Sequence, residues 1–295
     1  MSCFEQISQD VYVLKTPFNT QWASVVLIRG DGNFLIDSGA SSNVAQEVIV
    51  PALATIGLAP TDIGWLLATH SHGDHVGGHA CFKSLSGAKV VYWGQWVEKL
   101  RNPMKYSKLI RSAYPEHSPD PPAVLDGVDT DVLLDDGAIL AGRLQLVAAP
   151  GHDTDCICWL DIKTNTLIAG DSLQLNGTAG QGMALYNDYT AYRTTIAKIR
   201  DLQPQTIIAG HDYLPLGYLA VGKKAVTDYL DSCESISNFY TNALKQYIAD
   251  GIGDKVQLAT RMIADQGLSI PEKLFLALYT VDAHLHHIAK EKNTQ

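Results

Sequence analysis

Short apolar runs, separated by turn residues and helical stretches, occupy the chain from its start to about residue 220. Runs of this length and composition are typical of β-strands. The predicted strands are 11–14, 23–28, 34–36, 65–68, 90–93, 144–148, 157–160, 167–169 and 206–209. Between the second and the third of them lies Asp31-Gly32-Asn33, a sequence that favours a hairpin turn.

Helical spacing is found in two stretches between the strands. Residues 43–56 repeat apolar positions every three or four residues, with Ser42 or Asn43 as the candidate N-cap and Gly57 as the stop signal. Residues 189–202 form a second helical stretch. A chain that mixes strands and helices in this way predicts an α/β fold of layered sheets with helices outside.

The pattern breaks at residues 102–122, which hold five prolines. We interpret this segment as a short helix followed by a proline-rich surface loop. The overlapping region 93–111 holds four basic residues that are spaced for one helix face, which favours a solvated surface, with binding of a carboxylate or phosphate tail as the alternative. They are Arg101, Lys105, Lys108 and Arg111.

After residue 221 the chain has helical stretches only, at 223–250, 255–266 and 271–290. We therefore divide the chain into a first domain at 1–221 and an α-helical C-terminal extension at 222–295. The apolar stripes of the extension predict packing faces. A cap over an active site and a homodimer contact stay open as further uses. His284, His286 and His287 are expected at the surface.

Composition narrows the class of protein. Apolar residues make up 46% and charged residues 18%, which is ordinary for a globular chain. The formal net charge of −9 disfavours nucleic acid as a partner. We see neither a signal peptide nor an apolar run long enough to cross a membrane, so we expect a cytoplasmic protein. Five cysteines form no disulfide framework, and Cys156 and Cys158 are expected to be buried thiols.

The densest chemistry lies in Thr69-His70-Ser71-His72-Gly73-Asp74-His75, directly after the strand at 65–68. Imidazole nitrogens and carboxylate oxygens are ligands that suit zinc and neighbouring metals. Gly73 permits the sharp turning that a loop needs to direct four such side chains inward. This segment therefore predicts a metal site.

Three more metal-type residues repeat the same position, just after an apolar strand and next to a glycine: His152, Asp171 and His211. Functional sites in layered α/β folds gather at the carboxyl ends of strands. If these strands are neighbours, all seven side chains converge on one edge. Seven ligands exceed the needs of one tetrahedral ion and fit two ions that share a carboxylate.

Together these motifs resemble the metallo-β-lactamase superfamily, over about residues 4–220. The segment 69–75 resembles its main metal motif, and Leu35-Ile36-Asp37-Ser38-Gly39 resembles its second-strand signature. Pro150-Gly151-His152, Gly170-Asp171 and Gly210-His211 are similar to its remaining ligand positions, in the expected order. The branch indicated is that of glyoxalase II, lactonases and thioesterases, here with a helical extension.

The resemblance implies an αββα sandwich fold and a role for each motif residue. His70, His72 and His152 would hold the first metal; Asp74, His75 and His211 the second; and Asp171 both. Asp37 would support the site without binding metal, which agrees with the way carboxylates orient metal-binding histidines.

The implied activity is zinc-dependent hydrolysis of an ester, thioester or lactone on a small-molecule substrate. A hydroxide bridging two divalent metal ions, with Fe or Mn as alternatives to Zn²⁺, would attack the carbonyl. Asp74 is the candidate catalytic residue, since it could orient that hydroxide or pass its proton to the leaving group. Alternatives are a phosphodiesterase or ribonuclease, a β-lactamase-type amidase, an iron-dependent redox enzyme, and a ligand-binding regulatory protein with vestigial activity.

The substrate pocket is harder to locate. Residues 177–189 follow Asp171 and include three glycines, which suit a flexible loop. An ordinary connection is the simpler interpretation of this loop. As a specificity loop, it would offer Met183, Tyr186 and Tyr189 as substrate-binding residues.

Overall fold

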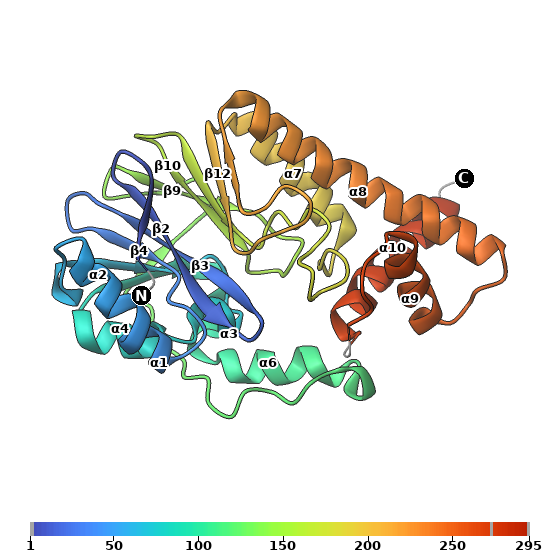
Figure 1. Ribbon diagram of the computed structural model, residues 1–295, viewed down its shortest axis with the longest axis horizontal. Coiled ribbons are helices and arrows are strands. Elements are labelled where there is room, and N and C mark those ends of the chain that lie inside the picture. Colours follow the sequence, from blue (N-terminus) through green and yellow to red (C-terminus); the bar gives the residue numbers. More distant parts are fainter. Residues whose placement is uncertain (1–2, 272–273, 294–295) are drawn as a thin grey trace.

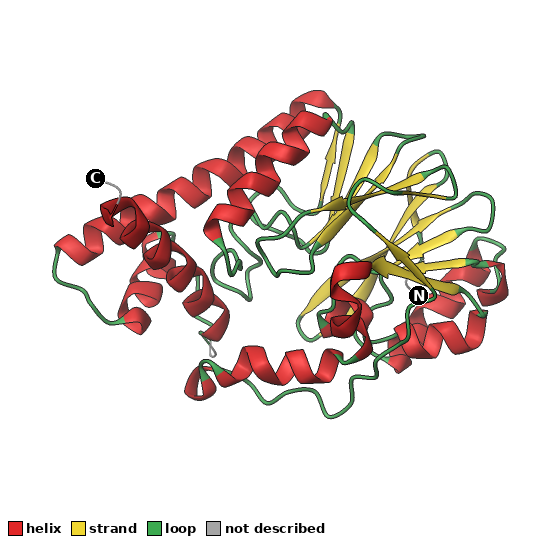
Figure 2. Cartoon of the chain, turned by 180° about the vertical axis from the view of Figure 1, so that it is seen from behind, coloured by secondary structure: helices red, strands yellow, loops and turns green. Residues whose placement is uncertain are grey.

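The computed structural model describes residues 3–271 and 274–293. Two β-sheets face each other, and helices cover both outer faces, giving the four layers of an αββα sandwich (Figure 1). Seen from behind, the helices of the C-terminal extension continue beyond the sandwich on one side (Figure 2). The predicted α/β class, the sandwich and the helical extension are therefore confirmed.

The first sheet has seven strands in sequence order, antiparallel from β1 to β4 and parallel from β4 to β7. These are β1 (Glu5–Ser8), β2 (Val11–Phe18), β3 (Gln21–Ile28), β4 (Phe34–Ile36), β5 (Trp65–Leu67), β6 (Lys89–Trp93) and β7 (Val132–Leu134). Asp31-Gly32-Asn33 joins β3 to β4 in the predicted hairpin, with Gly32 and Asn33 at positive φ.

The second sheet has six strands in the order β13-β12-β11-β10-β9-β8, and only β11 and β12 are parallel neighbours. They are β8 (Ile139–Leu140), β9 (Leu144–Ala148), β10 (Ile157–Asp161), β11 (Thr166–Gly170), β12 (Thr206–Ala209) and β13 (Leu219–Val221). Because β10 is antiparallel to both β9 and β11, the strands β9, β11 and β12 all run in one direction.

Alternate residues of β10 show why these strands are apolar throughout. Ile157 and Trp159 belong to the core between the two sheets. Cys158 and Leu160 point the other way, into the core beneath the helices. A strand buried on both faces has no polar side, so it appears in the sequence as a continuous apolar run. Cys158 and its neighbour Cys156 are buried and free, as predicted.

The helices form the two outer layers. On the first sheet lie α1 (Ser42–Val44), α2 (Val50–Thr55) and α4 (His79–Ser86). A π-helical turn, Ala45–Ile49, joins α1 to α2 where a single helix was predicted. Pro51 in the first turn of α2 lacks the amide hydrogen that an ordinary helix would use there, which accounts for the irregular turn.

The second sheet is covered by α7 (Tyr189–Leu202) and by α8 (Lys223–Ala249), which begins two residues after β13 ends. Two more helices, α9 (Lys255–Asp265) and α10 (Phe275–Asn293), complete the extension. One apolar core joins them to β9–β12 and α7. The division of the chain between residues 221 and 222 therefore stays a prediction. Within residues 3–271 and 274–293, no helix combines the length and the apolar character needed to cross a bilayer.

His284 was expected at the surface, and that expectation is wrong. Its ring is fully buried where α10 packs against α8, with Nε2 2.6 Å from the Tyr186 hydroxyl and Nδ1 2.9 Å from Thr241 Oγ1. His286, on the opposite face of α10, is exposed, and His287 is partly buried. Helical spacing alone could not reveal which face of α10 has partners.

We predict that His284 makes the fold sensitive to acid. Burial lowers the pKa of His284 from 6.5 to about 3. The unfolded chain therefore takes up this proton at higher pH than the folded chain, so the stability that His284 contributes is complete above pH 6.5 and is lost as the pH falls towards 3. Between pH 7 and pH 5 the free energy of unfolding should fall by about 2 kcal/mol more in the wild type than in His284→Gln.

Urea unfolding at the two pH values measures this difference. His286→Gln, on the exposed face of the same helix, is the matched control and should behave like the wild type. Equal losses in the wild type and in His284→Gln would contradict the prediction.

Candidate metal centre

Four strands direct side chains to one place. From the first sheet, β5 leads into a loop and the short helix α3 (Gly73–Val76), which together hold residues 69–75. In the second sheet the three strands that run in one direction each end shortly before a single metal-type residue: β9 before His152, β11 before Asp171 and β12 before His211.

Hydrogen bonds between the sheets bring these ends together. The Ile157 amide donates to the Thr69 carbonyl at 2.9 Å, and the Ser24 amide donates to the Gly210 carbonyl at 2.8 Å. The convergence proposed from sequence is thus present, although the strand before His70 lies in the other sheet. We call the seven side chains that meet here the ligand group: His70, His72, Asp74, His75, His152, Asp171 and His211.

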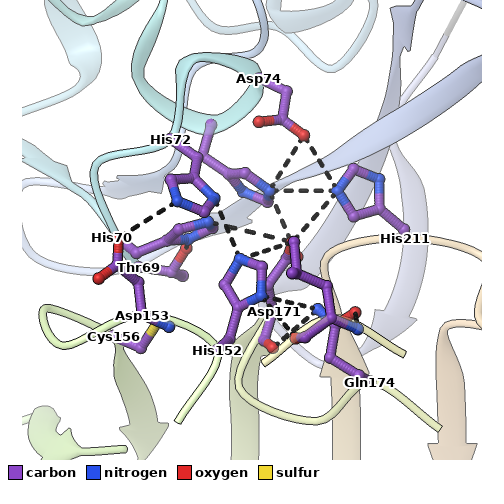
Figure 3. A network of polar contacts seen from close by, with 12 residues as sticks. Thr69, His70, His72, Asp74, His152, Asp153, Cys156, Asp171, Gln174 and His211 are labelled. Carbon is purple, nitrogen blue, oxygen red and sulfur yellow. Dashed lines mark hydrogen bonds and ion pairs between the residues drawn. The ribbon is translucent and has the colours of Figure 1, made fainter. Parts of the chain in front are cut away.

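Three histidines form one end of the ligand group (Figure 3). One nitrogen from each of His70, His72 and His152 lies within 4.8 Å of the other two. His72 Nδ1 and His152 Nε2 are 3.0 Å apart. At the other end, Asp74 Oδ2 lies 3.2 Å from His211 Nε2 and 3.7 Å from His75 Nε2.

Asp171 lies between the two ends. Its Oδ2 is 3.5 Å from His152 Nε2 and 3.5 Å from His211 Nε2, while its Oδ1 is 3.3 Å from His75 Nε2. It is the one member of the ligand group that contacts histidines of both ends through its carboxylate. This is the placement that the family resemblance implied for a shared ligand.

Outer contacts fix which nitrogen each histidine presents. His152 Nδ1 is 2.9 Å from the Leu185 carbonyl, and His211 Nδ1 is 2.7 Å from the Trp22 carbonyl. A carbonyl oxygen can only accept, so Nδ1 carries the hydrogen in both rings. Nε2 is therefore the atom of each ring that faces the centre of the ligand group and is left to bind a metal.

Asp37 plays the same part for His75. Its Oδ2 is 2.8 Å from His75 Nδ1, and the carboxylate also accepts hydrogen bonds from the amide and the hydroxyl of Thr69, both at 2.8 Å. The side chain is almost fully buried. The structure thus places Asp37 against the His75 nitrogen that does not face Asp74 and Asp171, and its supporting role stays a prediction.

We predict that Asp37→Asn weakens metal binding without preventing folding. The amide has one accepting oxygen where the carboxylate has two, and it loses the charge that raises the basicity of the His75 ring. Loss of such a partner lowers metal affinity by about 10- to 100-fold. Competition with a zinc-binding dye measures this affinity. Asp31→Asn, at an exposed turn, should match the wild type; unchanged affinity in Asp37→Asn would refute the role.

A partly buried ionic network next to His72 was missed in the sequence. His72 Nε2 is 3.3 Å from Asp153 Oδ2, and Lys99 Nζ donates to Asp153 at 2.6 Å and to Asp155 at 3.1 Å. The Tyr92 hydroxyl donates to Asp155 at 2.7 Å. Asp153 directly follows His152, which was an available signal, whereas nothing near Lys99 indicated that it approaches the site.

The electrostatics of the ligand group favour bound positive charge. Burial alone would lower the pKa of His75, but the Asp171 and Asp74 carboxylates outweigh it and raise that pKa well above its usual value. In the same way, against burial, Asp171 raises the pKa of His211 to about 10. Burial lowers the pKa of His152 to about 4. The carboxylates thus favour positive charge on the neighbouring histidine rings. A bound divalent cation would supply positive charge at the same place.

Two buried atoms of the ligand group lack hydrogen bonds, as expected of atoms that bind a metal. His70 Nε2 and Asp171 Oδ1 are buried and have no hydrogen-bond partner in the described part of the chain. Leaving a buried polar atom unpaired costs about 1–3 kcal/mol, so such atoms point to a missing partner. Nitrogen and carboxylate donors without sulfur suit zinc, iron or manganese.

Two glycines let the backbone come close to the ligand group. Gly170, before Asp171, has φ +49°, and a Cβ there would press on the Thr69 side chain. A Cβ on Gly210, before His211, would collide with Asp171 Oδ1 and His75. Side chains at these two positions would displace the ligands themselves.

A cavity of about 490 Å³ lies over the ligand group, which is within the usual size of a small-molecule site. Its floor includes His72, Asp74, His152, Asp171 and His211. Its walls come from the β2–β3 turn, from α6 (Pro103–Ser112) and the proline-rich loop after it, from residues 180–185, and from the start of α10. The extension therefore contributes to the cavity, one of the uses left open above.

The cavity does not include the three substrate-binding residues suggested from sequence. Met183, Tyr186 and Tyr189 are buried in the core beneath the extension, where the Tyr186 ring stacks on Tyr192. Their large apolar surfaces pack against helices, which removes them from solvent and from the cavity. The same loop instead lines the cavity with Gly180, Gln181 and Leu185.

Comparisons with known proteins agree with the fold and the ligand group. The family model described as the metallo-beta-lactamase superfamily matches residues 20–211. A beta-lactamase-like protein 2 homolog of Drosophila melanogaster is 25% identical over 285 residues, covering 91% of this chain and 85% of its own. A hydroxyacylglutathione hydrolase of Rhodospirillum rubrum is 26% identical over 176 residues, covering 57% of this chain and 58% of its own.

Among solved structures, a metallo-beta-lactamase family protein from Thermus thermophilus superimposes with a TM-score of 0.73 at 20% identity. The superposition covers 97% of this chain and 95% of that one, so the similarity in fold includes the helical extension. Because the family model spans well over half of the chain and all seven members of the ligand group, the chain belongs to the metallo-beta-lactamase superfamily.

Proposed function

We propose that this protein is a hydrolase of carboxylic esters, thioesters or lactones that depends on two divalent metal ions, with zinc as the native metal. The observation that carries the proposal is the ligand group itself. Its two ends, joined by Asp171, form the floor of a cavity of small-molecule size. The hydroxyacylglutathione hydrolase among the relatives supports a thioester as one substrate type.

His70, His72 and His152 would hold one ion, Asp74, His75 and His211 the other, and Asp171 both. When bound, such ions act as Lewis acids towards a carbonyl oxygen and lower the pKa of water towards neutrality. The outer contacts of His75, His152 and His211 keep the ligand atoms in place before a substrate arrives, so little reorganisation is needed during the reaction.

Asp74 is suited to move a proton. Its Oδ2 faces His211 and His75, while the side chain keeps 16% of its surface exposed and lines the cavity. Asp171, by contrast, is only 4% exposed. We assign to Asp74 the task of taking a proton at Oδ1 from the attacking water and passing it to the leaving group.

The walls of the cavity favour an acyl substrate. Pro103, Ile110, Leu125 and Phe275 present apolar surface close to the polar floor. Such walls bind the hydrocarbon part of an ester or thioester and exclude bulk water from the reacting carbonyl.

The proposal is tested by an activity screen of zinc-loaded protein whose metal content has been measured. Nitrophenyl esters, acyl thioesters and lactones should be hydrolysed, and treatment with a chelator should remove both the activity and two zinc ions per chain. Bis-nitrophenyl phosphate and nitrocefin test the phosphodiesterase and β-lactamase alternatives. Turnover of either of these without turnover of any ester, thioester or lactone would refute the proposal.

A further inference from the structure

Arg111 differs from the other basic residues of its segment. Arg101 pairs with Asp129 at 2.9 Å, and Lys105 and Lys108 are exposed, as a solvated face requires. Arg111, near the end of α6, is half-buried and lines the cavity over the ligand group. The alternative use of this face, in binding an anion, therefore applies to this one residue.

The surroundings of Arg111 hold it in place. Its Nη1 donates to the carbonyl and the hydroxyl of Ser107, at 2.7 and 2.8 Å, and its guanidinium lies over the Phe275 ring at 5.7 Å. The Tyr279 hydroxyl donates to the Ile110 carbonyl at 2.8 Å, which ties the end of α6 to α10. The side chain thus has a fixed position on the wall that these two helices share.

The charge of Arg111 has no ion-pair partner among the described residues, and the one carboxylate near enough to stabilise it is Asp74 of the ligand group. Its Nε is buried without a hydrogen-bond partner in the described part of the chain. An arginine stays protonated in proteins even when burial opposes its charge. A partly buried cation with an unpaired donor is unfavourable until an anion reaches it.

Apolar side chains line the cavity that contains both Arg111 and the floor. Ile110, Leu125, Phe275 and Leu276 share the lining with Arg111. A ligand that reaches both the floor and Arg111 therefore needs an apolar middle section and an anionic end.

We propose that Arg111 is a specificity-determining residue that binds a carboxylate at the end of the substrate distant from the scissile carbonyl. This inference rests on the proposed hydrolase function and adds the substrate class: an acyl ester or thioester with an apolar chain and a terminal carboxylate. Because Ser107 accepts from Nη1 and Nε is buried, Nη2 is the guanidinium group left to donate to a carboxylate oxygen, in a charge-assisted hydrogen bond. A single cation also balances a carboxylate better than a doubly charged phosphate.

The first arm of the test compares two esters that differ only at the chain end. These are the mono-para-nitrophenyl ester of adipic acid and para-nitrophenyl hexanoate, given to zinc-loaded protein. The wild type should prefer the adipate ester in kcat/KM, and Arg111→Met should lower that preference by about 10- to 100-fold, as loss of a charged hydrogen bond does. Lys108→Met, one turn away on the exposed face, should keep the wild-type preference, and Arg111→Lys should retain part of it.

The second arm does not depend on catalysis. Calorimetry with metal-free protein should show that phenylbutanoate binds, that phenylbutanol binds more weakly, and that Arg111→Met removes the difference. If the wild type hydrolyses neither ester, this arm alone decides the role of Arg111, and the wider activity screen decides the hydrolase function. Equal binding of phenylbutanoate by the wild type and Arg111→Met would overturn the inference. So would tighter Arg111-dependent binding of phenylpropylphosphonate, which would indicate a phosphate-type substrate.

Discussion

Asp171→Ala is expected to abolish turnover and to leave the protein with less than two bound metal ions per chain. The carboxylate contacts histidines at both ends of the ligand group, so its removal affects both ions at once. Because Lewis-acid stabilisation is worth several kcal/mol, kcat/KM should fall by about 10³-fold or more. Metal analysis after gel filtration and the hydrolysis of an ester or thioester measure the two effects.

Asp201→Ala, an exposed carboxylate on α7, is the control and should retain both metal and activity. Asp171→Asn separates charge from shape, since it keeps the size of the side chain and loses the negative charge. Two bound ions together with wild-type turnover in Asp171→Ala would exclude a shared ligand at this position. The assignment of the two ends to one dinuclear centre would then fail as well.

Trp159→Ala should lower the free energy of unfolding more than a substitution at the surface does. The indole is fully buried between the two sheets, and its Nε1 donates to the Ala68 carbonyl at 3.0 Å. Truncation leaves a large cavity and an unpaired carbonyl directly before Thr69 and the ligand group. We expect the free energy of unfolding to fall by about 3–5 kcal/mol in urea denaturation of the metal-free protein.

Trp159→Phe separates the loss of the hydrogen bond from the loss of packing. Phenylalanine fills much of the same space but cannot donate to Ala68, so its loss should be about 1–3 kcal/mol. If both variants were as stable as the wild type, the sheets would not be held together by this contact.

The strands and the ligand positions could be predicted from sequence because both depend on short-range patterns. Strands buried on two faces, such as β10 and β11, appear as apolar runs whatever packs on them. A histidine or aspartate that directly follows such a run lies at the carboxyl end of the strand, so the position of the strand determines where that side chain lies. The short strands β1, β7, β8 and β13 were missed because they are partly exposed or only two to four residues long.

What could not be predicted depends on contacts between distant segments. Lys99 reaches Asp153 across 54 positions of sequence, and Tyr186 meets His284 across 98. The partial burial of Arg111 could not be predicted either, because its spacing along the helix is the same as that of the exposed lysines. In each case the residue type indicated which interactions the side chain can make. Which of these interactions it makes depends on the helix or loop that buries it, and the sequence did not show that.

The glycines before Asp171 and His211 have a consequence for protein engineering. Since a methyl group at Gly210 would occupy the space of the Asp171 carboxylate, ligand and glycine cannot be exchanged independently. Introducing the seven side chains into another protein with this sandwich fold would fail unless glycines were also introduced at the positions of Gly170 and Gly210. Conversely, a homologue with alanine at position 210 could not recover the ligand group by restoring its histidines alone.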